Sequence, residues 1–290
     1  MATLKSIRTR IVSVKNTQKI TKAMKMVSAA KLRRAQTRLV SARPYVTKMQ
    51  SILGQMLQLI EGIPHPIFEK RESVKKIEFL IVTSDRGLCG GFNGNLLRRV
   101  ERFIKEKKST CEEIKISVVG RKGREYFRAR KMEPDHFITG IPEDMPFEQA
   151  RKIAEDLMAG YQEGRFDEFY IAYNYFRSAI SQEVRIEPLL PLMIPAAEKH
   201  EGYVPEYLYE PSRTKVLEDL IPRALATIIR RAFLESVAGE YGARMIAMDN
   251  ATNNSREMIY DLTLKMNRIR QAAITTELMD IVNGAESLKK

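Results

Sequence analysis

The residues that most suggest chemistry in this 290-residue chain form a glycine-rich loop at residues 83–94. The loop follows an apolar run at 79–82 and precedes a helical pattern, which is where phosphate-binding loops lie in α/β proteins. Its glycines follow the order G-x-x-G-G-x-x-G, whereas a dinucleotide-binding turn needs G-x-G-x-x-G. It also lacks the Gly-Lys pair, followed by Ser or Thr, of a P-loop. We therefore expect no nucleotide cofactor and interpret the segment as a structural loop.

Other candidates for chemistry are equally weak. Asp85 and Cys89 would supply an acid and a nucleophile, but no histidine lies near them in the sequence to act as a base. The histidines stand without a cysteine or carboxylate at ligand spacing: His65, His136 and His200. We expect no metal site, no cofactor and no catalytic residue. The only cysteines, Cys89 and Cys111, predict no disulfide framework and fit a reducing compartment.

Positive charge is concentrated in the first 60 residues. This block holds 13 Lys and Arg and no Asp or Glu, whereas the rest of the chain is balanced, so it accounts for the net charge of +13. A block of one sign indicates a polyanionic or acidic partner: nucleic acid, anionic lipid or an acidic protein surface. Tyr45 is its only aromatic residue, so a base-stacking platform for single-stranded nucleic acid is missing.

No apolar run reaches the length of a transmembrane helix, and residues 1–10 lack the apolar core of a signal peptide. We expect a soluble, unprocessed protein.

The middle of the chain, residues 70–210, predicts an α/β domain. Strands are expected at 79–82 and 114–119, with an amphipathic helix through 96–104 between them, which implies a parallel right-handed crossover. Helical patterns follow at 122–128 and 147–162. An alternating strand at 169–175 and a returning strand within 180–190 then predict a hairpin.

A very long helix is predicted from Arg213 to Gly284, within a C-terminal segment 211–290. No proline follows Pro222, so nothing beyond it removes a backbone donor. At 1.5 Å per residue the helix would be about 108 Å long, and it needs a partner along its seam. The seam recurs at steps of three and four and consists of Leu234, Ala238, Tyr241, Met245, Met248, Thr252, Ser255, Ile259, Leu262, Met266, Ile269, Ala273 and Thr276.

The N-terminal segment 1–60 predicts the partner helix. Its seam consists of Leu4, Ile7, Ile11, Val14 and, in the same register, Leu32, Ala35, Leu39, Ala42, Val46, Met49, Leu53, Met56 and Ile60. The intervening register positions are polar: Gln18, Thr21, Lys25 and Ser28. Apolar Ile20, Met24 and Val27 shift to a neighbouring face, either through the mismatch of 3.6 and 3.5 residues per turn or because a second partner lies there. Pro44 predicts a kink or break near Arg43.

Two dissimilar seams in one chain favour an antiparallel pair within the chain, although a parallel dimer stays possible. The N-terminal helix would be about 20 Å shorter, so one end of the longer helix must project. The apolar stripe continues through Ile274, Leu278, Ile281 and Leu288, which indicates that the projecting end is the C-terminal one.

Three runs of residues carry a resemblance to a known family. They are NTQKITKAMKMV at 16–27, SDRGLCG at 84–90, and ITTE at 274–277 followed by Gly284 and Ala285. Together they resemble the gamma subunit of bacterial F-type ATP synthases over the whole chain. The resemblance implies an antiparallel coiled coil of both termini with an inserted Rossmann-like α/β domain. It also implies a non-catalytic central-stalk rotor that couples proton-driven c-ring rotation to ATP synthesis.

The resemblance further implies partners and contact residues. The coiled coil would turn inside a hexamer of alpha and beta subunits, with the α/β domain on the membrane c-ring beside the epsilon subunit. Residues implied to contact the hexamer are Met24, Lys25, Arg244, Arg270, Gln271, Thr275 and Glu277, to which the basic block adds Lys19 and Lys22. Residues implied to face the c-ring are Tyr207 and Glu210.

A cytoplasmic, peripheral location on the bacterial inner membrane follows from the same resemblance, with membrane association through the c-ring only and no nucleic acid bound. Cys89 and Cys111 do not match the inserted redox pair of plastid members, so thiol regulation is not expected. Two alternatives stay open: a basic coiled coil that binds nucleic acid, and a nucleotide-dependent enzyme. Salt-dependent duplex binding would favour the first and saturable ATP binding the second.

Overall fold

The computed structural model describes residues 4–59, 66–193 and 209–287, with only the backbone described for 57–59 and 285–287. The chain forms two compact units. Unit 1 comprises residues 1–28 and 245–290, and unit 2 comprises residues 29–244. The long helices α1 (Leu4–Leu59) and α5 (Arg213–Ser287) each contribute to both units.

A side-chain cap begins α5, and tertiary packing carries α1 past its internal proline. Ser212 caps α5, because its Oγ accepts a hydrogen bond from the backbone N of Lys215 at 3.2 Å. A kink or break was predicted near Arg43, and the break is wrong, since α1 continues through Pro44. Val46, Met49 and Leu53, all buried on the following turns, hold the helix past the proline by tertiary packing.

Unit 2 contains a five-stranded sheet in the order β3-β2-β1-β4-β5. The strands are β1 (Lys76–Val82), β2 (Glu113–Val119), β3 (His136–Ile138), β4 (Glu168–Phe176) and β5 (Gln182–Leu190). Strand β1 is parallel to β2 and β4, β2 is parallel to β3, and β4 and β5 form an antiparallel hairpin. The predicted parallel crossover and hairpin are thus confirmed. The three-residue strand β3 was not predicted, because it is too short and too exposed to show a period.

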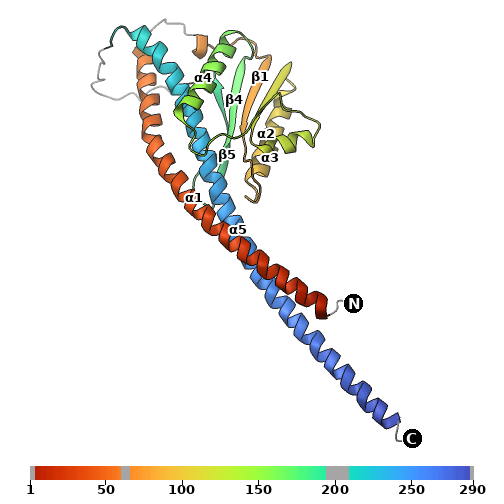
Figure 1. Ribbon diagram of the computed structural model, residues 1–290. Coiled ribbons are helices and arrows are strands. Elements are labelled where there is room, and N and C mark those ends of the chain that lie inside the picture. The colour runs from red at the N-terminus through yellow and green to blue at the C-terminus, as the bar shows by residue number, and fades with distance from the viewer. Residues whose placement is uncertain (1–3, 60–65, 194–208, 288–290) are drawn as a thin grey trace. The chain divides into compact units, whose positions relative to one another are not determined.

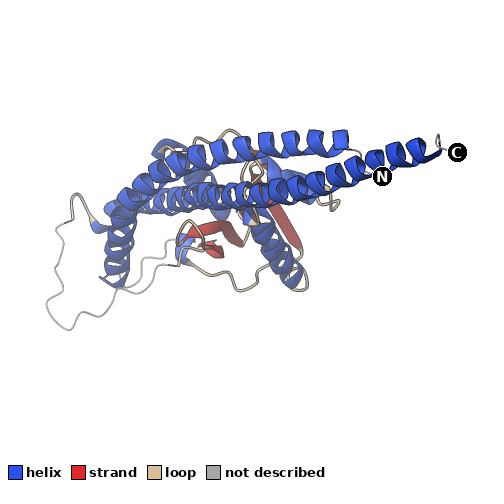
Figure 2. Ribbon diagram, turned by 90° about the horizontal axis from the view of Figure 1, so that it is seen from below, coloured by secondary structure: helices blue, strands red, loops and turns tan. Residues whose placement is uncertain are grey.

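Helices cover both faces of this sheet. This is expected because successive side chains of β1 point to opposite faces and both sets include buried apolar residues. Ile77, Phe79 and Ile81 pack with α2 (Phe92–Lys107) and α3 (Arg121–Arg128). Leu80 and Val82 belong to the opposite core, which α4 (Phe147–Gln162) shares with parts of α1 and α5. The short 3-10 helix η1 (Pro66–Phe68) adds Ile67 to that core. Figure 1 shows α4 on one side of the sheet and α2 with α3 on the other, and Figure 2 distinguishes the strands in red from these helices.

In unit 2, α1 and α5 run antiparallel, as contacts between their side chains establish. Lys31 of α1 bonds Tyr241 of α5, and Arg43 of α1 bonds Glu235 of α5, so one residue number rises while the other falls. The predicted antiparallel pairing within one chain is confirmed here.

Unit 1 shows the same pairing over the ends of both helices. Thr252 Oγ1 donates to Thr21 Oγ1 at 2.8 Å, and Lys25 Nζ lies 2.7 Å from Asp249 Oδ1. The seam therefore keeps its register through polar residues, whereas Ile20 and Val27 are exposed. Farther along α5, the side chains of residues 270–284 are exposed except for half-buried Ala273. This exposed stretch matches the predicted projecting end as far as Gly284; Leu288 lies outside the described residues.

Candidate functional site

The carboxyl edge of the parallel sheet is where doubly wound proteins bind ligands, at the point where the strand order reverses. Here that point lies between β1 and β4, because the chain passes from β1 to β2 and β3 before it returns to β4. Helix α5 of unit 2 contacts this edge. A Cβ on Gly242 would lie 3.1 Å from Cα of Ala179, just beyond β4, and one on Gly239 would lie 3.1 Å from the Phe92 ring. The glycines thus let the helix lie close against the edge.

Glu235 fixes α5 to β4 and to α1. Its side chain is fully buried, and its Oε2 accepts a hydrogen bond from the backbone N of Phe176 at 3.0 Å. Arg43 Nη2 donates to Glu235 Oε1 at 3.1 Å and to the Phe176 carbonyl at 3.3 Å. A buried carboxylate is costly without partners, and Glu235 has two: the positive charge of Arg43 and the backbone N–H of Phe176.

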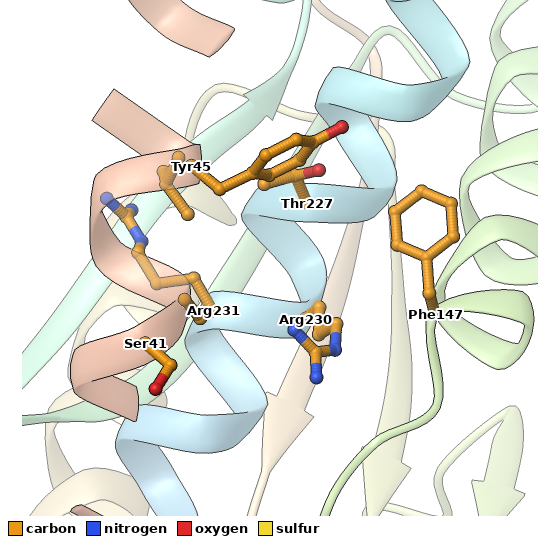
Figure 3. Close-up of a pocket in the computed structure, with 8 residues that line it drawn as sticks. Ser41, Tyr45, Phe147, Thr227, Arg230 and Arg231 are labelled. Carbon is orange, nitrogen blue, oxygen red and sulfur yellow. The ribbon is translucent and has the colours of Figure 1, made fainter. Parts of the chain in front are cut away.

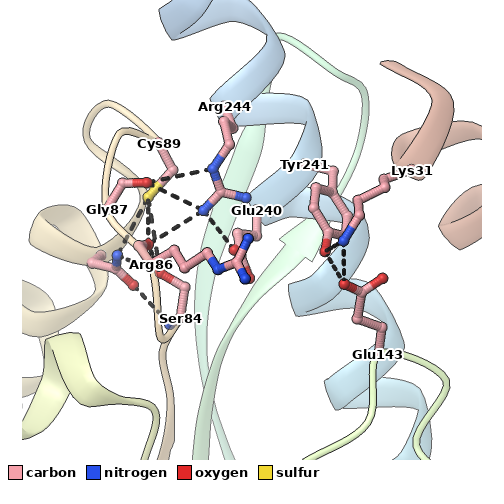
Figure 4. A network of polar contacts seen from close by, with 10 residues as sticks. Lys31, Ser84, Arg86, Gly87, Cys89, Glu143, Glu240, Tyr241 and Arg244 are labelled. Atoms are coloured by element: carbon pink, nitrogen blue, oxygen red, sulfur yellow. Dashed lines mark hydrogen bonds and ion pairs between the residues drawn. The ribbon is translucent and has the colours of Figure 1, made fainter. Parts of the chain in front are cut away.

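Arg244 fixes α5 to the glycine-rich loop. Its guanidinium donates to the carbonyls of Arg86 and Gly87, both at 3.2 Å, and to Glu240 at 2.6 Å (Figure 4). Arg244 is only 6% exposed. Burial raises the pKa of Glu240, although the Arg244 charge opposes that effect.

Within the loop, polar groups satisfy one another. Asn93 Oδ1 accepts from the backbone N of Ser84 at 3.0 Å, and Asn93 Nδ2 donates to Ser84 Oγ at 2.7 Å. Asp85 Oδ1 accepts from the backbone N of Arg121 at 3.0 Å. Cys89 is 3% exposed, and desolvation raises the pKa of its thiol, which disfavours the thiolate that a nucleophile needs. The geometry supports the interpretation of a structural loop.

A second polar cluster joins α1, α5 and the loop that precedes α4. Lys31 Nζ donates to Glu143 Oε1 at 2.7 Å and to the Tyr241 hydroxyl at 3.1 Å, and that hydroxyl donates to Glu143 (Figure 4). Burial and the hydrogen bond with Glu143 raise the pKa of Tyr241 to about 12. Burial opposes ionisation of Glu143, but the hydrogen bonds from Lys31 and Tyr241 outweigh it and lower the pKa of Glu143.

The predicted contact residues of the basic block lie in unit 1. Lys19 and Lys22 are exposed, and Met24 is half-buried. The side chains of Lys25 and Asp249, joined by their ion pair, are 41% and 37% exposed. Lys25 therefore already has an acidic partner within the chain.

The other predicted contact residues are widely separated in the chain. Exposed side chains on the last turns of α5 are Arg270, Gln271, Thr275 and Glu277. Thr275 Oγ1 donates to the Gln271 carbonyl of its own helix at 3.0 Å. Glu210 is exposed just before α5. Tyr207, His65 and His200 lie outside the described residues.

A cavity of about 310 Å³ lies between α1, α4 and α5 of unit 2 (Figure 3). Tyr45 of α1, Phe147 at the start of α4 and Arg230 of α5 line it. Arg230 Nε donates to the Met145 carbonyl at 2.9 Å, and Arg231 Nη2 donates to Glu187 at 3.2 Å. In the described part of the chain, no group of three or more His, Cys, Asp or Glu residues is arranged to hold a metal ion.

Sequence reasoning missed Glu235, Glu143 and the close approach at Gly239 and Gly242. A carboxylate at 235 inside the apolar run 232–238 was the available signal, because a charge in such a run indicates a buried ion pair. The spacing places Tyr241 on the seam but does not indicate its bond to Glu143.

Comparison with known proteins gives a consistent result. A family model described as ATP synthase matches residues 3–288. The chain is 50% identical over 289 residues to the ATP synthase gamma chain of Geobacter metallireducens, and 44% identical over 295 residues to that of Bdellovibrio bacteriovorus. Both alignments cover 100% of this chain and of the relative.

Two solved structures are also similar. One is from the central stalk and c-ring of Tetrahymena thermophila mitochondrial ATP synthase, with a TM-score of 0.58 and 27% identity over 80% of this chain and 99% of that chain. The other is from the OSCP/F1/c-ring assembly of Euglena gracilis mitochondrial ATP synthase, with a TM-score of 0.68 over 98% of this chain and 94% of that chain. At 19% identity, the second likeness concerns the fold alone. These similarities give no support to a nucleic-acid-binding coiled coil. Among the described helices, none has an apolar stretch long enough to cross a membrane.

Proposed function

The chain belongs to the family of ATP synthase gamma chains, and we propose that it acts as the non-catalytic rotor of the central stalk. As a rotor it turns with the c-ring inside the hexamer of alpha and beta subunits, beside the epsilon subunit. The observation that carries this proposal is the end of α5 in unit 1. Its apolar Ile274, Leu278 and Ile281 are 49%, 57% and 68% exposed, as expected for an axle tip that a protein sleeve covers.

A rotor acts by differential contacts. Three equivalent catalytic subunits meet different faces of one asymmetric shaft, so each turn shifts their conformational equilibria in sequence. The shaft needs no reacting group of its own. In support, the loop residues Asp85 and Cys89 accept hydrogen bonds from the chain's own atoms. Catalysis would then belong to the partner subunits.

The basic block would meet an acidic surface of a beta subunit. Lys19 and Lys22 are exposed, whereas Met24 and the seam residue Lys25 are half-buried. Each exposed ion pair is worth only about 0–1 kcal/mol, so we expect the summed charge, rather than any one lysine, to guide the partner.

The remaining contacts follow from exposure. Residues Arg270, Gln271, Thr275 and Glu277 would touch the hexamer directly, because all four are exposed. Arg244 belongs to the same proposed set, but its guanidinium is taken up by the glycine-rich loop, so its contact would pass through that loop.

The α/β domain would rest on the c-ring through Tyr207 and Glu210. Association with the membrane would then be peripheral, through the c-ring only, at the cytoplasmic face of the bacterial inner membrane.

Native co-purification tests this function. The full-length chain, tagged at its N-terminus and expressed in its native host, should co-purify with alpha and beta subunits in an ATP-hydrolysing complex. Recovery of the chain alone, or of a chain that hydrolyses ATP without alpha and beta, would contradict the proposal.

A further inference from the structure

Several side chains of α5 in unit 2 bond the α/β domain, Arg230 and Arg231 among them. Three others form what we call the carboxyl-edge clamp: Glu235, Tyr241 and Arg244. Glu235 bonds the end of β4, Tyr241 bonds Glu143 of the loop before α4, and Arg244 bonds the loop after β1. All three partners lie at or near the carboxyl ends of sheet strands.

The anchors leave the helix in different directions. At about 100° per residue, Glu235 and Arg244 lie about 180° apart around the α5 axis, with Tyr241 between them at about 120° from Glu235. Figure 4 shows Arg244 pointing to the glycine-rich loop and Tyr241 pointing to Glu143 and Lys31. Rotation of α5 about its own axis would therefore strain hydrogen bonds on more than one side of the helix.

Between Glu235 and Arg244, α5 also packs closely against the α/β domain at two glycines. A Cβ on Gly239 would come within 3.3 Å of Gln182, and one on Gly242 would come within 3.1 Å of the Ala179 carbonyl oxygen. Apolar packing alone resists slip weakly because it is non-directional, whereas hydrogen bonds with fixed geometry hold one azimuth.

We propose that the carboxyl-edge clamp transmits torque between the α/β domain and α5, with Glu235 as its main positioning residue. Glu235 is singled out because it is fully buried and because its carboxylate joins α5, β4 and α1 through Phe176 and Arg43. The edge that holds a ligand in doubly wound enzymes holds the chain's own helix here. This inference rests on the proposed rotor function.

The test measures angular stiffness in the assembled complex. The hexamer is fixed to a surface, and a bead is attached through Ser109→Cys in a Cys111→Ser background, since position 109 is exposed and Cys89 is buried. The variance of the bead angle during pauses at low ATP reports how firmly the α/β domain follows the shaft.

Glu235→Gln keeps the side-chain volume but removes the charge that pairs with Arg43, and Tyr241→Phe removes the hydroxyl that bonds Glu143. We expect each variant to increase the angular variance at least twofold, and the double variant to increase it further, while the rate of unloaded ATP hydrolysis is kept. Glu218→Gln is the matched control, because it removes only an exposed ion pair with Lys215 on the same helix and should leave the variance unchanged.

A merely structural role would lower thermal stability without changing the variance of complexes that assemble. If the angular variance is unchanged in Tyr241→Phe, and also in Glu235→Gln where that complex assembles, the proposal that the clamp transmits torque is wrong. A wild-type bead that does not rotate with ATP would instead contradict the rotor function.

Discussion

Reversal of the charge at Lys25 is the perturbation that best separates a contact within the chain from a contact with a partner. Lys25 lies 2.7 Å from Asp249 in unit 1, and both side chains are more than one-third exposed. Lys25→Glu therefore removes one solvent-screened ion pair and creates a like-charge pair. Each effect is worth about 0–1 kcal/mol, so we expect the chain to lose about 1 kcal/mol of unfolding free energy and still assemble.

The expected effect on coupling is larger than this loss of stability. If an acidic surface of a beta subunit meets Lys25 as the shaft turns, the reversal replaces attraction by repulsion at one rotary position. The assay is ATP-driven proton pumping per ATP hydrolysed, in membranes that carry the variant complex. We expect Lys25→Glu to lower this ratio while the amount of assembled complex stays near that of the wild type.

Asp249 supplies the controls. Asp249→Asn removes the pair within the chain but leaves Lys25 positive, so the pumping ratio should be nearly normal. Lys25→Glu with Asp249→Asn removes the repulsion within the chain, yet the ratio should remain low, because the partner still meets a negative charge. An unchanged ratio in Lys25→Glu and in the triple reversal of Lys19, Lys22 and Lys25 would refute the contact. Recovery in the double variant would assign the effect to the chain's own helix pair.

Further predictions concern both units. The pKa of Glu143 is lowered in the folded chain, so its contribution to stability is present above its unfolded pKa of about 4.3 and is lost as the pH falls through its folded pKa. In urea unfolding, the loss of unfolding free energy that Glu143→Gln causes at pH 7 should therefore shrink on acidification. An equal deficit at all pH values would contradict this. Thr21→Val with Thr252→Val replaces both hydroxyls of a buried seam contact, and we expect unfolding free energy within about 1 kcal/mol of the wild type, with the single variants less stable. Truncation after Gly284 should leave coupling intact, whereas truncation after Arg270 should lower it strongly in the same pumping assay; full coupling in the shorter chain would exclude the axle role. Calorimetry of the full chain with ATP should show no saturable heat, because α5 and Arg244 engage the carboxyl edge and its loop, and a micromolar dissociation constant would contradict that view.

Much of the fold could be predicted because periodicity reports burial directly. Spacing alone places five buried residues on the seam: Leu234 and Ala238 in unit 2, and Met248, Thr252 and Ser255 in unit 1. Helix α4 has the predicted bounds 147–162, since its apolar positions recur cleanly.

What could not be predicted depends on tertiary contacts. The continuation of α1 through Pro44 depends on packing against other elements, which a local rule about proline does not contain. The partners of Glu235 are Phe176 and Arg43, each more than 50 residues away in the chain, so no spacing rule joins them. Gly239 and Gly242 lie in a helix, where glycine reads as a weakness until the neighbouring Ala179 and Phe92 are known.

The most direct test of the rotor account is a rotation assay on the complex assembled with the unaltered clamp. With the hexamer fixed to a surface and a bead on residue 109 of the α/β domain, ATP should drive sustained rotation in one direction, and rotation should stop when ATP is removed. A bead that only fluctuates about one angle, on complexes that hydrolyse ATP at the normal rate, would contradict the claim that this chain is the rotor.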